Sequence, residues 1–238
     1  MRDGVSDGMS DGAVLSFFGD HFKRLVRRAL GQETPALAEA NAQGQDSPLL
    51  RRSSGMREFW KAIEGPPGLK ILDLGAASQA NVTFITDLGY KLYTADLLQS
   101  FQNSASNGGR LGEAPETEES FFRDNCNYGE GEFDGILCWD LFDFVADPLI
   151  KPLIEKLLQS LKPGGTVLSF FHTGSAGQPV PLYQYRIRSA DTRQMTGRGT
   201  ARLERHFNNR TIENLFKKCA SLKFYLSRDS LREVISVR

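Results

Sequence analysis

The chain has 238 residues, of which 29 are basic and 29 are acidic. This length buries one sizeable core, and the balanced charge gives no overall positive field that would attract nucleic acid or an anionic membrane. No apolar run reaches the roughly 20 residues of a membrane span, and the start lacks the basic and then apolar order of a secretory signal. We therefore expect a soluble, non-exported, cytoplasmic protein.

The three cysteines, Cys126, Cys138 and Cys219, form no CxxC pair. The sequence therefore indicates neither a disulfide framework nor a structural zinc site. No expected helix carries two histidines at the spacing of metal ligands. We expect reduced thiols and no metal.

Residues 1–56 read as an N-terminal extension. Residues 3–12 repeat Asp-Gly steps that favour turns, and we expect a flexible start there rather than a calcium site. Residues 13–30 have a helical period with basic side chains largely off the apolar stripe; docking on the main domain is expected, and membrane or RNA contact is the alternative. Residues 32–54 read mostly as linker.

From residue 57 onward, apolar strands alternate with helical segments, the pattern of a mainly parallel sheet covered on both faces. A short helix over MREFWKAI comes first, and the polar residues 102–120 read as a surface loop. Expected strands cover residues 69–74, 91–95, 120–123, 133–139 and 166–171. Expected helices cover residues 79–88, 97–104, 146–161 and 211–220.

The end of the chain departs from an ordinary parallel fold. After the helix TIENLFKKCA, which we expect Thr211 to cap, come LKFYLS and LREVISV with only RDS between them. A connection of three residues forces the two strands into an antiparallel hairpin.

Four motifs stand in order before that hairpin: ILDLG, TAD, FDGILCWDLFDFV and LKPGGTVLSFF. Each is weak alone, but with the hairpin their order and spacing make residues 57–238 resemble the class I methyltransferases. The resemblance implies S-adenosylmethionine as cofactor. It also implies an α/β three-layer sandwich with a seven-stranded, mostly parallel sheet in the order 3-2-1-4-5-7-6 and an antiparallel C-terminal hairpin.

Ligands of open α/β sheets lie beyond the carboxyl ends of the strands. There, Gly75 lets the backbone approach a cofactor closely, with Ala76 and Ala77 completing the turn. The resemblance implies that Asp73 helps to hold the amino-acid end of the cofactor. Asp96, at the end of the second strand, is expected to accept both ribose hydroxyls.

The resemblance further implies that Asp124 bonds the adenine amino group, with Asn125 as a neighbouring polar contact. Trp139 and Asp140 are expected to line the methionine portion, where an aromatic face suits a sulfonium cation. Structural roles are the alternatives: Asp73 capping a turn, Asp96 capping a helix and Trp139 packing in the core.

The turn after the first strand departs from the family pattern acid-x-Gly-x-Gly-x-Gly, because Ala77 and Gln79 stand at the second and third glycines. Since the cofactor carries no phosphate, the turn need not wrap a pyrophosphate, and we expect that it can still bind the cofactor. Gln79 is expected to begin the next helix.

Methyl transfer needs alignment of the acceptor, and a hydroxyl or protonated amine also needs a general base. Asp140, Asp143 and His172 are the candidates, because each follows a strand end. The alternatives are hydrogen bonding within a turn for His172 and a helix cap for Asp143.

The acceptor is not encoded in a familiar motif, since no Asn/Asp-Pro-Pro-aromatic run and no Pro-Cys pair is present. Selectivity is expected in an insertion over residues 172–208. Its aromatic and basic composition favours binding of an anionic substrate or RNA. The alternative is an ordinary solvated cover segment whose arginines pair with carboxylates. Its aromatic and basic residues are Tyr183, Tyr185, Arg186, Arg188, Arg193, Arg198, Arg202 and Arg205.

We expect a methyltransferase with a small-molecule acceptor, leaving RNA and protein acceptors open. The alternative is a catalytically silent cofactor- or partner-binding protein on the same fold. A nicotinamide-dependent oxidoreductase fits poorly, because the second glycine of its fingerprint is missing and the terminal hairpin is unexplained.

Overall fold

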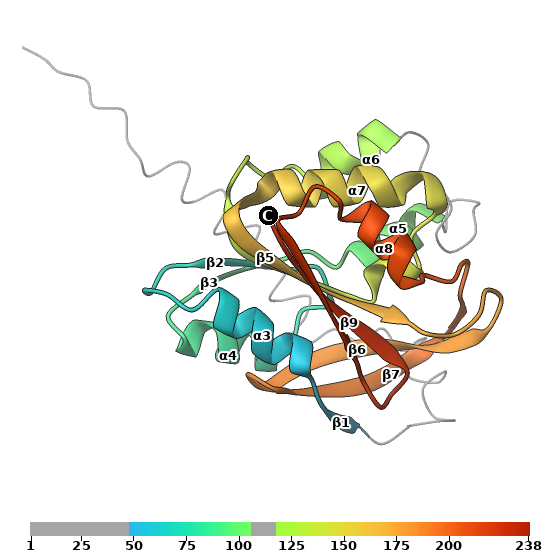
Figure 1. Cartoon of the computed structure of the whole chain (residues 1–238), viewed down its shortest axis with the longest axis horizontal. Helices are drawn as coiled ribbons and strands as arrows, with labels where there is room; N and C mark the ends of the chain where they lie inside the picture. The colour runs from blue at the N-terminus through green and yellow to red at the C-terminus, as the bar shows by residue number, and fades with distance from the viewer. Residues whose placement is uncertain (1–47, 106–117) are drawn as a thin grey trace, which may run out of the picture. The chain divides into compact units, whose positions relative to one another are not determined.

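The structure is a computed structural model that describes residues 48–105 and 118–238 (Figure 1). The expected helix over residues 13–30 and most of the expected linker lie outside these ranges, as does most of the expected surface loop. From residue 70 onward, strands and helices alternate as the sequence predicts.

The main sheet has six strands in the order β3-β2-β4-β5-β9-β8. Pairs β2–β3, β2–β4 and β4–β5 are parallel, and β9 is antiparallel to both of its neighbours. The fold is therefore α/β with a mostly parallel sheet, and the predicted terminal hairpin is confirmed. The strands are β2 (Lys70–Asp73), β3 (Lys91–Thr94), β4 (Phe133–Trp139), β5 (Leu161–His172), β8 (Ser221–Leu226) and β9 (Leu231–Val237).

The prediction of a strand over residues 120–123 is wrong. These residues belong to helix α6 (Glu118–Asn125). Phe121 stacks on Phe101 of helix α5 (Leu97–Ala105), with ring centroids 4.2 Å apart. The described part of the main sheet thus lacks the third strand, and the seven-stranded order 3-2-1-4-5-7-6 is not confirmed.

The other helices lie near where the pattern predicts them, with two corrections at α8, which ends at Leu215 rather than near residue 220 and has another cap. Its cap is Asn208 rather than Thr211, because the Asn208 side chain accepts a hydrogen bond from the Thr211 backbone N–H at 2.9 Å. The helices are α3 (Ser54–Ala62), α4 (Gln79–Asp87), α7 (Asp147–Ser160) and α8 (Asn209–Leu215).

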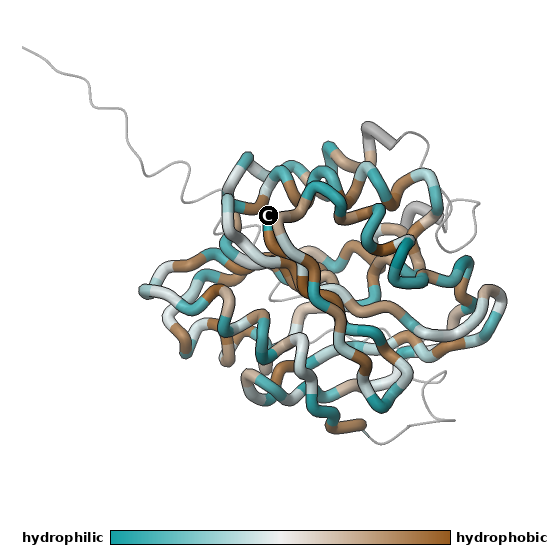
Figure 2. The backbone as a smooth tube through the Cα atoms, in the orientation of Figure 1, coloured by the Kyte–Doolittle hydropathy of each residue, from teal (hydrophilic) through white to brown (hydrophobic). Residues whose placement is uncertain are grey.

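Helices cover both faces of the main sheet, with α5, α6, α7 and α8 on one face and α3 and α4 on the other (Figure 1). Successive strand residues alternate between these two layers: Leu72 and Val167 pack with the first, and Ile71 and Leu168 with the second. Strands buried on both faces are apolar at nearly every position, and Figure 2 shows the main-sheet strands as largely hydrophobic.

A second sheet of three strands, in the order β1-β7-β6, packs on the face that carries α3 and α4. Strands β6 (Pro179–Ser189) and β7 (Thr192–Arg202) form a long antiparallel hairpin, and β1 (Leu49–Arg52) pairs with β7. The expected insertion over residues 172–208 is therefore mostly this β6–β7 hairpin. Residues 49–52 are a strand rather than linker, so folded structure begins before residue 57.

A buried ion pair fixes the hairpin to the main sheet. Arg193 of β7 is fully buried, and its Nη1 donates to Oε1 of Glu233 on β9 at 2.5 Å. Its Nη2 donates to Asp229 at 2.8 Å, and its guanidinium lies over the Phe170 ring. Glu233 also accepts from the Gly55 backbone N–H at the start of α3, at 2.6 Å. One charge network thus joins the small sheet, the main sheet and α3.

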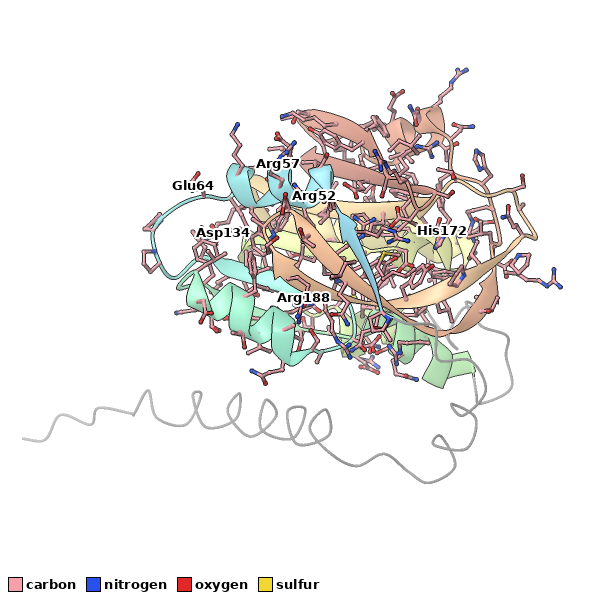
Figure 3. The ribbon with its side chains drawn as sticks, turned by 90° about the horizontal axis from the view of Figure 1, so that it is seen from below. Arg52, Arg57, Glu64, Asp134, His172 and Arg188 are labelled. Atoms are coloured by element: carbon pink, nitrogen blue, oxygen red, sulfur yellow. The ribbon has the colours of Figure 1, made fainter. Side chains whose placement is uncertain are left out.

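Replacing Arg193 by methionine should destabilise the protein by about 3–5 kcal/mol, because Glu233 and Asp229 would stay buried without a counter-charge. Urea unfolding at neutral pH measures the change in the free energy of unfolding. The control is Arg188→Met, on the exposed side of β6 (Figure 3), with an expected change within about 0.5 kcal/mol. Equal losses in the two variants would contradict the role given to Arg193.

Candidate functional site

The parallel strands β2, β3, β4 and β5 end at the same edge of the main sheet, which we call the rim. Residues that end or follow β2, β3 and β4, but not His172 at the end of β5, line one cavity there. Its lining holds five of the expected cofactor residues, Gly75, Ala76, Asp96, Trp139 and Asp140, together with Leu74, Leu98, Cys138, Leu141 and the hairpin residues Tyr183, Tyr185 and Arg198.

Asp73 is fully buried, and both of its carboxylate oxygens are used within the chain. Oδ1 accepts from the Trp139 indole N–H at 2.6 Å and from the Gly75 backbone N–H at 3.0 Å, and Oδ2 accepts from the Asn81 amide at 2.8 Å. Burial raises the pKa of Asp73, and the hydrogen bonds from Trp139, Asn81 and Gly75 oppose that rise. In this arrangement Asp73 fixes the turn, the alternative role that the sequence allowed.

Gly75 allows a close approach to its backbone, but the group that approaches it is the Trp139 ring. A Cβ atom added at Gly75 would lie 2.7 Å from Cδ1 of the Trp139 ring. Trp139 is 2% exposed and has a φ of 52°, a left-handed conformation that costs a tryptophan about 1–3 kcal/mol. Its bond to Asp73 and its parallel stacking on Tyr185, with centroids 5.0 Å apart, offset this cost.

Asp96 lies at the end of β3 with two partners of its own. Its Oδ1 accepts from the Gln99 backbone N–H at 3.0 Å and so caps α5, as the alternative interpretation predicted. Its Oδ2 lies 3.6 Å from Nη1 of Arg198 on the hairpin. The carboxylate expected for the ribose is thus paired with a side chain of the insertion.

Asp140 directly follows β4 and His172 is the last residue of β5. The two side chains lie side by side, and both are buried (His172 is labelled in Figure 3). Asp140 Oδ2 accepts from the Tyr185 hydroxyl at 2.8 Å and lies 3.5 Å from Nε2 of His172. In the sequence, Tyr185 stands only among the basic and aromatic residues of the insertion. Its position in the alternating run PVPLYQYRIRS was the available signal that it points inward.

Asp143 lies in a 3₁₀ turn over Leu141–Asp143 and does not cap α7. Its Oδ2 accepts from the His172 backbone N–H at 2.7 Å, and its Oδ1 is buried without a protein partner. Burial raises the pKa of Asp143 to about 7, although the hydrogen bond from His172 opposes the rise. Asp143 therefore holds the end of β5 in place beside Asp140.

The structure does not bring Asp124 and Asn125 to the rim cavity. Both lie in α6 rather than after a strand: Asp124 pairs with Arg123 at the surface, and the Asn125 side chain donates to the Phe121 carbonyl. Ala77 is absent from the lining, and its carbonyl accepts a long hydrogen bond, 3.5 Å, from Gln184 of β6. Gln79 begins α4, as predicted.

The residues of the rim do not fit S-adenosylmethionine in this arrangement. The cavity has a volume of about 30 Å³, room for little more than a water molecule, whereas small-molecule pockets measure about 300–1,000 Å³. A larger cavity of about 630 Å³ is lined by Arg51, Arg52, Arg228, Glu233 and their neighbours, and it shares no residue with the rim cavity. The expected ligands are gathered, but the chain's own side chains fill the space between them.

The three cysteines are free. Within residues 48–105 and 118–238, no group of three or more histidine, cysteine, aspartate or glutamate side chains is arranged to hold a metal ion. Over the same residues, no helix is long and apolar enough to cross a membrane.

Several solved structures resemble this chain. A methyltransferase from Mesorhizobium loti is 13% identical, with 78% of this chain and 98% of that chain covered and a TM-score of 0.45. An Archaeoglobus fulgidus methyltransferase is 6% identical, with coverages of 77% and 91% and a TM-score of 0.48. The 1,6-didemethyltoxoflavin-N1-methyltransferase of Burkholderia thailandensis is 14% identical, with coverages of 100% and 93% and a TM-score of 0.43.

No curated protein matches the chain significantly. A family model described as a methyltransferase domain matches residues 22–219, most of the chain. This match agrees with the mostly parallel sheet, the antiparallel terminal hairpin and the gathering of strand-end residues at the rim. The chain therefore belongs to the class I methyltransferases and is an S-adenosylmethionine-dependent methyltransferase.

Proposed function

We propose that the methyl acceptor is a small molecule with a hydroxyl or amine group, and that Asp140 and His172 accept its proton. The observation that supports this is the array in which the Asp140 carboxylate lies between the Tyr185 hydroxyl, at 2.8 Å, and His172 Nε2, at 3.5 Å. A base of this kind acts at the end of β4 and β5, where ligands of open α/β sheets lie.

The array has the parts that proton transfer needs. His172 Nε2 is buried and faces Oδ2 of Asp140 at 3.5 Å, so a proton taken up by this pair is shared between the carboxylate and the imidazole. Asp140 stabilises the imidazolium that results. In the arrangement without a bound donor, Tyr185 holds Asp140 in place. Asp143 is a positioning residue, because it binds the backbone N–H of His172 rather than its ring.

The side chains of the insertion favour a small acceptor over RNA. A single-stranded RNA platform needs exposed aromatic and basic side chains, whereas Tyr185 is buried and Arg193 is held by two carboxylates. Arg205 donates to the Phe142 and Val145 carbonyls and pairs with Asp147. These contacts are those of a cover segment in which Arg193 and Arg205 are satisfied internally, while Arg188 and Arg202 are exposed.

A partner-binding protein on the methyltransferase fold is the second candidate. The observation that favours it is the rim cavity of about 30 Å³. Such a protein would transfer no methyl group to any acceptor, so the labelling experiment below separates the two candidates.

Incubation with S-adenosylmethionine labelled in its methyl group should label the low-molecular-weight fraction of a cell extract. The Asp140→Asn variant should lower the initial rate roughly 100-fold, the usual contribution of a general base. Asp147→Asn, which changes an exposed acid beside Arg205, is the matched control and should keep the wild-type rate. Label in RNA or protein alone would contradict a small acceptor.

The pKa of His172 should fall in Asp140→Asn. Burial lowers this pKa. The hydrogen bond and charge of Asp140, and then the charges of Asp143 and Asp229, raise it by more than burial lowers it, so the pKa of His172 lies above its ordinary value of 6.5. As a base, His172 acts in its neutral form, so the acid limb of the rate profile should rise with pH above 6.5. NMR titration of the His172 ring measures the midpoint directly; an equal midpoint in wild type and Asp140→Asn would contradict the coupling.

A further inference from the structure

We propose that the β6–β7 hairpin is a cover over the methyl-donor site, and that S-adenosylmethionine binds only after the hairpin segment from Leu182 to Ile187 leaves the rim. The proposal concerns the donor and does not depend on the acceptor chemistry given above.

Contacts within the chain already use the polar groups expected to bind the donor. Asp73 accepts from three donors, none of them a ligand. Asp96 pairs with Arg198 and Asp140 accepts from Tyr185, so the hairpin supplies the partner at two of these three acids. A ribose hydroxyl or an ammonium group would have to replace these hairpin side chains, not add to them.

Aromatic side chains fill the space itself. The Trp139 and Tyr185 rings are stacked with an angle of 2° between their planes, and the Trp139 ring lies directly against Gly75. Tyr185 also contacts Phe170, so it is packed on two sides. The donor is far larger than the cavity of about 30 Å³ that these rings leave.

The hairpin is built so that its middle can separate from the rim. It belongs to the small sheet, so its displacement breaks no ladder of the main sheet. Arg193 anchors its turn, and backbone bonding between Gln178 and Leu203 closes its other end. Between these anchors the register shifts at Leu182 and Tyr183, opposite an exposed stretch that contains Gly197 and Gly199, where φ is +137° at Gly199. An irregular, exposed segment of this kind opens at low cost, whereas Tyr185 and Ile187, which are buried and paired with Met195 and Arg193, must give up their packing when the rim opens.

A closed majority state lowers the apparent affinity for the donor in proportion to the open fraction. Substitutions that weaken the closed state should therefore tighten donor binding, although they remove side chains from the wall of the site. If the hairpin only lined a preformed pocket, the same substitutions would weaken donor binding, because they would remove contacts with the donor. This difference in sign is what the experiment measures.

Calorimetric titration with S-adenosylhomocysteine should give roughly threefold tighter binding for Arg198→Ala, which removes a partly exposed ion pair with Asp96, and roughly tenfold for Tyr185→Ala. The control is Arg202→Ala, which changes an exposed arginine of the same strand that bonds the Gly177 carbonyl and should keep the wild-type affinity.

Amide exchange gives a readout that does not depend on the stability of any variant. The Ile187 backbone N–H donates to the Asn81 side chain at 2.8 Å, and Asn81 also donates to the Tyr185 carbonyl. Lifting Tyr185 from the rim breaks both bonds, so saturating S-adenosylhomocysteine should speed exchange at Ile187 in the wild-type chain.

Slower exchange at Ile187 on binding, or weaker binding by both Arg198→Ala and Tyr185→Ala, would show that the hairpin is a fixed wall of the donor site and would overturn the proposal. Absence of binding by the wild type and both variants would overturn it as well, since release of the hairpin would then create no site. Tightened binding without labelled product would support the cover and contradict only the proposed methylation of a small acceptor.

Discussion

The carboxylate of Asp73 is the interaction on which the geometry of the rim depends. It accepts hydrogen bonds from the turn after β2, from Trp139 at the end of β4 and from Asn81 in the first turn of α4. Asn81 extends the network to β6 through Ile187. Loss of the acid would leave several buried donors without an acceptor, which costs about 1–3 kcal/mol for each. Contacts within the chain therefore set the arrangement of these four elements without any ligand.

The sequence predicted the elements whose pattern is local and strong. Buried runs such as ILDL and FDGILCW have one interpretation, and three residues between the last two strands allow only a hairpin. Residues 120–123 were misassigned because two adjacent phenylalanines suit a strand and a helix equally. Strand β1 has four residues and exists through its pairing with β7, far along the chain, so no local pattern could reveal it.

The place of the strand-end residues was predictable, but their contacts were not. Topology places Asp96, Asp140 and His172 at one edge, because parallel strands end together. It does not say which side chain meets each acid. Arg198 and Tyr185, which reach two of them, come from an insertion whose arginines drew attention to charge, whereas the alternation along PVPLYQYRIRS carried the information about burial.

The glycine-poor turn and the covering hairpin have one physical cause. Gly75 remains because a Cβ there would strike the Trp139 ring, so the glycine is required by the chain's own indole. Two positions on, Ala77 offers its carbonyl to Gln184 of β6, and the first turn of α4 offers Asn81 to the same strand. In the family pattern, glycines leave the backbone of this turn accessible to a cofactor. In this chain the backbone of Gly75 and Ala77 contacts Trp139 and β6 instead. A turn that packs against protein gains nothing from extra glycines, whose freedom costs about 0.5–1 kcal/mol each relative to alanine.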